Sequence, residues 1–185
     1  WSTYSFKDRI EQIRIALSYF EYNADEVARD ITLQMGKSIL QSKEELRIFA
    51  NQSKALLHEF ETREDPLNKT AIGFALHIGT WNYPVMNIMN PLISELISGT
   101  PFLLKPSSKV ALCGRHFEKA FESLDLTGLV TNLFVTHKQV SDLLIHPLIH
   151  QASFSGSSEV RASVVKHSAK RHFALIPNIQ GRESF

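Results

Sequence analysis

The sequence is poor in cysteine and in long apolar runs. Cys113 is the single cysteine among 185 residues, so the chain forms no internal disulfide and offers no cysteine-type zinc site. No apolar run approaches the roughly 18 residues that cross a bilayer, and no basic segment followed by an apolar stretch opens the chain. We therefore expect no membrane span, and an intracellular protein of the cytoplasm or the mitochondrial matrix.

An excess of charge of one sign is lacking as well. The 20 Lys and Arg residues and the 19 Asp and Glu residues leave a net charge of +1, which gives no general attraction to nucleic acid. The balance is uneven along the chain, because residues 1–65 carry 9 basic and 12 acidic side chains whereas residues 66–185 carry 11 and 7. A bound anion is therefore expected in the second part.

The residues that are present suffice for a hydrophobic core. The chain is 43% hydrophobic and 21% charged, which is typical of soluble globular domains. Its length predicts one domain, or at most two, and a chain of this size buries roughly 70% of its unfolded surface. The first residue is Trp1 and not Met, so we expect a processed or trimmed polypeptide.

Residues 1–65 show the periodicity of amphipathic helices. Three stretches carry apolar side chains at helical spacing: Ile10, Ile13, Leu17 and Phe20; Val27, Ile31 and Met35; Leu46, Phe49, Leu56 and Phe60. Asn23 and Glu26 have the spacing of a capping box before the second stretch, and Gly36 is expected to end it. The pattern predicts a segment of three helices that packs on the same domain as the rest of the chain.

Residues 66–185 alternate between short apolar runs and longer segments. The runs of strand length are Ala71–Ile78, Pro101–Leu104, Leu129–Val135, Leu148–Phe154 and Phe173–Ile176. The expected covering helices are Pro84–Gly99, Val110–Ser123 and Ser158–Lys170. This alternation predicts βαβ units, and therefore an α/β fold in which a Rossmann-like domain with a parallel sheet follows the helical segment.

Ligands of such sheets bind beyond the carboxyl ends of the strands. The loops expected there contain Asn82, Lys105 and the pair Gly156-Ser157, and small residues at a helix start leave N–H groups for an anion. The standard dinucleotide and P-loop glycine motifs are absent from the sequence. No metal site is expected, because Pro147 separates His146 from His150.

Four motifs, taken in order, resemble the nicotinamide-nucleotide-binding part of the aldehyde dehydrogenase superfamily. They are GTWNYP at 79–84, SGTPFLLKPS at 98–107, HPLI at 146–149 and FSGS at 154–157. The GTWNYP form looks most like the fatty-aldehyde and succinate-semialdehyde dehydrogenase branches. Trp1, Arg9 and the Met35-Gly36-Lys37 turn are similar to the helical segment of the family, so the resemblance covers essentially the whole chain.

The resemblance implies a cofactor, NADP or NAD, and a role for individual residues. Asn82 matches the side chain that donates to the oxyanion formed when a cysteine thiolate attacks an aldehyde. Trp81 and Lys105 match the wall of the cofactor pocket and the residue beside the adenosine ribose. Gly156 and Ser157 match the turn that receives the pyrophosphate.

The sequence also departs from the family pattern. Ser108 stands where the family has a glutamate on the ribose hydroxyls, which favours a 2′-phosphate and hence NADP. Arg161 takes the place of a glycine in the pyrophosphate turn, and Asn178 takes the place of the glutamate that acts as general base. By the resemblance the catalytic cysteine would lie beyond Phe185. Cys113 lies on an expected helix and is predicted to be a buried apolar residue.

Two functions of different class remain open. In the first, the chain is a fragment of an active NAD(P)-dependent aldehyde dehydrogenase that oxidises an aldehyde to a carboxylic acid. In the second, it is a divergent relative without activity of its own, which serves as a structural or assembly subunit in a homo- or hetero-oligomer. Arg161 and Asn178 favour the second, because they lie within the chain.

Overall fold

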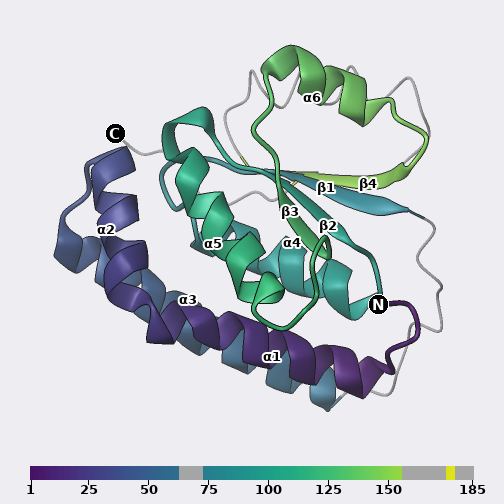
Figure 1. Ribbon diagram of the computed structural model, residues 1–185, viewed down its shortest axis with the longest axis horizontal. Helices are drawn as coiled ribbons and strands as arrows, with labels where there is room; N and C mark the ends of the chain where they lie inside the picture. Colours follow the sequence, from purple (N-terminus) through teal and green to yellow (C-terminus); the bar gives the residue numbers. More distant parts are fainter. Residues whose placement is uncertain (63–72, 156–173, 178–185) are drawn as a thin grey trace.

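The structure, a computed structural model, describes residues 1–62, 73–155 and 174–177. The chain begins with three helices, α1 (Phe6–Tyr22), α2 (Ala24–Met35) and α3 (Ile39–Glu61), which lie together along one side of the molecule (Figure 1). The three helices expected from the apolar periodicity are confirmed.

The ends of these helices are set by local hydrogen bonds. Ser5 caps α1 and Ser38 caps α3, each in a capping box with the residue three positions on. Gly36 ends α2 with a φ of 81°, as expected. The capping box predicted at Asn23 is wrong: Asn23 makes no capping bond to α2, and its Nδ2 donates instead to the Tyr19 carbonyl of α1. Asn23 is the single residue between the two helices, so its backbone lacks the extended conformation that a capping box requires.

The second part of the chain forms a five-stranded sheet in the order β3-β2-β1-β4-β5. All four neighbouring pairs are parallel, so the predicted fold class is confirmed. The strands are β1 (Phe74–Ile78), β2 (Phe102–Lys105), β3 (Val130–Asn132), β4 (Ile149–Phe154) and β5 (Ala174–Pro177). The order reverses between β1 and β4, and ligands of open parallel sheets bind at such a switch point.

Helices cover both faces of the sheet (Figure 1). On one face lie α4 (Met86–Ile97) and α5 (Ala111–Glu122); on the other lies α6 (His137–Leu144), whose Val140 and Leu144 pack against the apolar side chains of β1 and β4. The first two helices were predicted, whereas α6 was not singled out. The expected helix Ser158–Lys170 lies outside the described residues.

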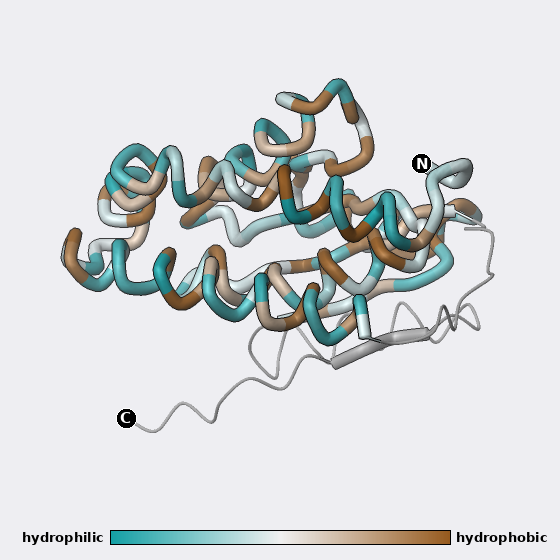
Figure 2. Tube along the Cα trace, turned by 90° about the horizontal axis from the view of Figure 1, so that it is seen from below, coloured by the Kyte–Doolittle hydropathy of each residue, from teal (hydrophilic) through white to brown (hydrophobic). Residues whose placement is uncertain are grey.

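The amino-terminal helices share one core with the helices under the sheet. Phe20 of α1 lies 4.9 Å from Phe49 of α3 and 4.6 Å from Phe117 of α5, between ring centroids. Polar links join the same parts, since the Trp1 indole donates to the Leu96 carbonyl at 2.9 Å. Apolar and polar residues alternate around these helices (Figure 2), as burial of one face requires. None of the helices in the described part of the chain is both long and apolar enough to cross a bilayer.

Candidate functional site

Backbone hydrogen bonds bring three strand ends together. The Gly79 N–H donates to the Lys105 carbonyl at 2.9 Å, and the Ser155 N–H donates to the Ile78 carbonyl at 2.9 Å. The loops after β1, β2 and β4 therefore leave the sheet side by side. This is the edge at which the sequence predicted the site.

Lys105 is the last residue of β2 and is buried, with 6% of its surface exposed. Burial lowers the pKa of its ammonium group, because the charged form loses hydration. No carboxylate pairs with it among the residues that the structure describes. A buried cation with no countercharge in its described surroundings is suited to bind an anion.

The loop after β2 contributes a second cation. Ser107 caps the short 3-10 helix η1 (Ser108–Val110), and Ser108 is exposed at its start. The Nζ atom of Lys109 lies 4.9 Å from the centre of the Trp81 ring, which is a cation–π distance. The structure therefore places Trp81 and the η1 turn next to each other, while sequence reasoning missed Lys109.

Asn82 is half-buried, and hydrogen bonds fix its side-chain orientation. Its Oδ1 accepts from the Tyr83 N–H and from the Thr80 hydroxyl, both at 3.1 Å. A backbone N–H only donates, so the amide atom that faces it must be the oxygen. The Nδ2 donor is thus turned away from these two groups and has no hydrogen-bond partner within the described residues.

The structure shows an ion pair beneath this loop that the sequence analysis did not predict. Lys37 and Glu45 lie 2.6 Å apart, with 11% and 1% of their side chains exposed. A signal was available, because Glu45 lies next to Leu46 and four residues before Phe49, on the buried side of α3. A carboxyl group at such a position needs a partner.

Several predicted site residues fall outside the described part of the chain. They are Gly156, Ser157, Arg161 and Asn178. Their predicted roles in the pyrophosphate turn and at the general-base position therefore stay predictions.

Cys113 is fully buried on α5, as predicted. Burial raises the pKa of its thiol to about 12, and the Gln34 amide donates to its sulfur at 3.5 Å. A thiol in this state is not a nucleophile at neutral pH.

One cluster of possible metal ligands lies between α2 and α5. The ligand atoms of Glu26, Asp30 and His116 lie within 4.8 Å of one another. Each already has a protein partner: His116 bonds Asp30 at 2.8 Å and Tyr19 at 3.1 Å, and Glu26 accepts from Lys119 at 3.4 Å. The cluster is explained as a polar contact between helices.

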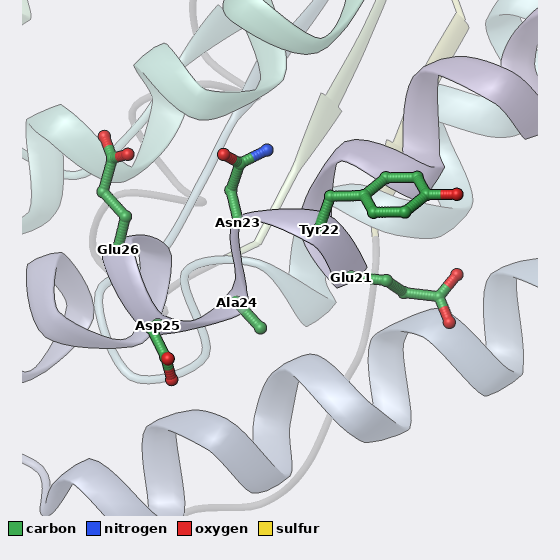
Figure 3. Close-up of a pocket in the computed structure, with 6 residues that line it drawn as sticks. All are labelled: Glu21, Tyr22, Asn23, Ala24, Asp25 and Glu26. Carbon is green, nitrogen blue, oxygen red and sulfur yellow. The ribbon is translucent and has the colours of Figure 1, made fainter.

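A depression at the turn between α1 and α2 is lined by residues 21–26 (Figure 3). It includes none of the predicted site residues. Its carboxylates are neutralised from neighbouring helices, since Glu21 pairs with Lys54 and Asp25 pairs with Lys43, both at 2.7 Å. We assign no binding role to it.

Comparison with known proteins identifies the family of the chain. The profile of the aldehyde dehydrogenase family matches residues 1–182. The chain belongs to the aldehyde dehydrogenase family. It is 26% identical to the succinate-semialdehyde dehydrogenase [NADP(+)] of Deinococcus radiodurans, over 100% of this chain and 41% of that protein. The Escherichia coli succinate-semialdehyde dehydrogenase [NADP(+)] is 24% identical, over 92% of this chain and 38% of that protein.

Solved aldehyde dehydrogenases have the same fold. The enzyme from Bartonella henselae superposes with a TM-score of 0.88 at 20% identity, covering 98% of this chain and 41% of that one. Succinic semialdehyde dehydrogenase from Streptococcus pyogenes, solved with NADP+ as the cofactor, gives a TM-score of 0.79 at 22% identity, covering 98% of this chain and 43% of that one. The chain thus spans about two fifths of the length of these relatives.

Proposed function

We propose that this chain is the nicotinamide-nucleotide-binding part of an aldehyde dehydrogenase and that it prefers NADP+ to NAD+. The observation that carries the proposal is Lys105, a buried cation without a described countercharge at the carboxyl edge of a parallel sheet. Among the described residues, Trp81, Lys105 and Ser108 would hold the cofactor. By the family resemblance, Gly156 and Ser157 would receive its pyrophosphate. When bound, the nicotinamide supplies an acceptor for a hydride.

The preference for NADP+ follows from the charges of two neighbouring positions. Lys105 offers a positive charge to a 2′-phosphate, and Ser108 lacks the carboxylate that would bind the free ribose hydroxyls and repel a phosphate. Affinity is expected to be weak, because Arg161 brings a charged side chain to a turn where backbone must approach the phosphates.

Calorimetric titration of the 185-residue chain tests this proposal. We expect NADP+ to bind more tightly than NAD+, Lys105→Met to weaken NADP+ binding by about tenfold or more, and Ser108→Glu to shift the preference towards NAD+. Lys43→Met is the matched control, because Lys43 is a half-exposed lysine paired with Asp25 away from the sheet edge. Tighter binding of NAD+ than of NADP+, or unchanged binding in Lys105→Met, would refute the assignment.

We infer for the chain by itself a structural or assembly role beside other protein subunits. The described thiol, Cys113, is buried and protonated at neutral pH, and Asn178 stands at the position assigned to the base. An amide cannot take a proton from water. An intact-mass measurement of the natural polypeptide distinguishes the alternatives: a mass near 21.0 kDa supports the assembly role, and a much larger mass supports a fragment of an active dehydrogenase.

A further inference from the structure

The Lys37–Glu45 ion pair contacts the loop that carries Asn82 from two sides. The Lys37 ammonium donates to the Asn82 carbonyl at 3.1 Å and lies 4.5 Å from the centre of the Tyr83 ring. The Glu45 carboxylate accepts the Val85 N–H at 3.0 Å and the Met86 N–H at 3.3 Å. The loop is therefore held at both ends by one buried pair of charges.

Glu45 also replaces a local helix cap. Val85, at the N-cap position of α4, makes no side-chain capping bond, so the first N–H groups of α4 need acceptors from elsewhere. Glu45 supplies them from α3, and a carboxylate is favoured there by the helix dipole. The start of α4, and with it the end of the Asn82 loop, is thereby tied to the amino-terminal helices.

Burying two charges is not an efficient way to gain stability. A buried ion pair recovers its lost hydration only when further hydrogen bonds complete it, and well-packed apolar residues often serve equally well. Here the further bonds all go to the Asn82 loop and the start of α4. The two charged side chains fix the backbone of residues 82–86, which apolar side chains in their place would not do.

The orientation of the Asn82 side chain depends on that backbone. Its Oδ1 is held by the Tyr83 N–H and the Thr80 hydroxyl, so a rotation of the loop would move the Nδ2 donor with it. A preorganised donor stabilises a developing oxyanion only when it is held in place before the reaction.

We propose that Lys37 and Glu45 are positioning residues that hold the Asn82 amide in the orientation of an oxyanion donor. The oxyanion role of Asn82 is the one implied by the family resemblance and rests on the proposed assignment of the chain to an aldehyde dehydrogenase, whereas the effect of the ion pair on its orientation does not. The amino-terminal helices then contribute to the site and do not only cover the sheet.

The test is NMR and fluorescence spectroscopy of the isotope-labelled 185-residue chain. The side-chain amide signals of Asn82 are assigned by their loss in Asn82→Ala, and quenching of Trp81 by acrylamide is measured in a Trp1→Phe background, where Trp81 is the single tryptophan. Lys37→Met removes the ammonium group, Glu45→Gln removes the negative charge at nearly constant shape, and Lys37→Arg keeps the charge. Lys54→Met and Glu21→Gln are the matched controls, because these residues form an exposed ion pair at 2.7 Å between α3 and α1.

We expect the Asn82 amide signals to shift and broaden in Lys37→Met and in Glu45→Gln, with increased quenching of Trp81. Lys37→Arg should return both measurements towards those of the parent protein, and the control variants should leave them unchanged. Parent-like Asn82 and Trp81 signals in folded Lys37→Met would overturn the proposal. So would unfolding of both Lys37→Met and Glu45→Gln under native conditions, because the pair would then serve stability alone.

The same samples separate this proposal from the proposed function. Neither spectroscopic measurement requires a cofactor, so changed Asn82 signals in protein that binds no NADP+ would support the positioning role and refute the nucleotide assignment. NADP+ binding together with unchanged Asn82 signals in Lys37→Met and Glu45→Gln would support the nucleotide assignment and refute the positioning role.

Discussion

Glu95 is a buried carboxyl group on α4 whose protonation affects the stability of the fold. Burial raises its pKa to about 7, although the Gln151 amide that donates to it acts in the opposite direction. Since the pKa is higher in the folded than in the unfolded chain, the folded state binds more protons between about pH 4.5 and 7. Stability should therefore fall as the pH rises through this range and stay lower above it.

We expect Glu95→Gln to remove this pH dependence. A raised pKa of this size corresponds to roughly 3–4 kcal/mol, so the variant should be more stable than the parent at pH 8 by up to about that amount and should show a flatter pH profile. Urea unfolding at several pH values measures this, with the exposed Glu122→Gln on α5 as control. If the free energy of unfolding of Glu95→Gln fell with pH as steeply as that of the parent, Glu95 would be ionised at little cost in the folded state.

Cys113 is the second residue whose chemistry is set by burial. Because its thiol is inaccessible and its pKa is raised to about 12, we expect a thiol reagent such as DTNB to react with it only after the protein unfolds. Leu112→Cys provides the positive control, since Leu112 is 50% exposed and adjacent in sequence. Rapid stoichiometric labelling of Cys113 in the folded parent would contradict its assignment as an inert core residue.

At the scale of elements, the contact between α5 and β3 depends on a glycine. A Cβ atom at Gly114 would overlap the Oδ1 atom of Asn132 and approach the Pro106 side chain to 3.0 Å. Helix propensity alone favours alanine over glycine by roughly 1 kcal/mol, so the two effects oppose each other. The destabilisation by the overlap should exceed the gain in helix propensity, because Asn132 is buried and is hydrogen-bonded to Glu118 and Ala111.

We therefore expect Gly114→Ala to destabilise the protein by about 1–3 kcal/mol despite its better helix propensity. Chemical denaturation gives the free energy of unfolding, and Arg115→Ala, an exposed position on the same helix, controls for substitution in α5. A stabilised Gly114→Ala variant would mean that β3 can move away from α5 without loss.

For the whole molecule, we expect no oxidation of aldehydes by this polypeptide. The reaction needs a thiolate, an oxyanion donor and a base. Of these three groups, only the oxyanion donor is matched by a residue of this sequence, Asn82. Oxyanion stabilisation by itself contributes roughly 10² to 10³ in rate, far less than the full reaction requires. Absorbance of reduced cofactor, followed with NADP+ and short and long aldehydes, measures turnover. Turnover that persists in Cys113→Ala would show that the chemistry lies at residues other than those assigned.

Local sequence patterns predicted much of the fold and part of the candidate site. Apolar periodicity identified α1 to α3, and the short apolar runs identified the strands to within a few residues, because burial of one helix face or of a strand imposes a spacing on the sequence. The motif at 79–84 indicated Asn82 and Trp81. The helix α6 was not singled out, although Thr136 and Gln139 have the spacing of a capping box and form one.

The sequence by itself determined the fold class, the family and the loops at which a nucleotide is expected, since these depend on periodicity and on short motifs along the chain. Only the tertiary structure decided the state of each side chain. In the folded chain Lys105 is buried and the pKa of the Cys113 thiol is raised. The Asn23 side chain donates to the last turn of α1, and the Lys37–Glu45 pair lies beneath Asn82. The physical reason is that burial and polar pairing depend on contacts between residues as far as 97 positions apart, which no local pattern contains.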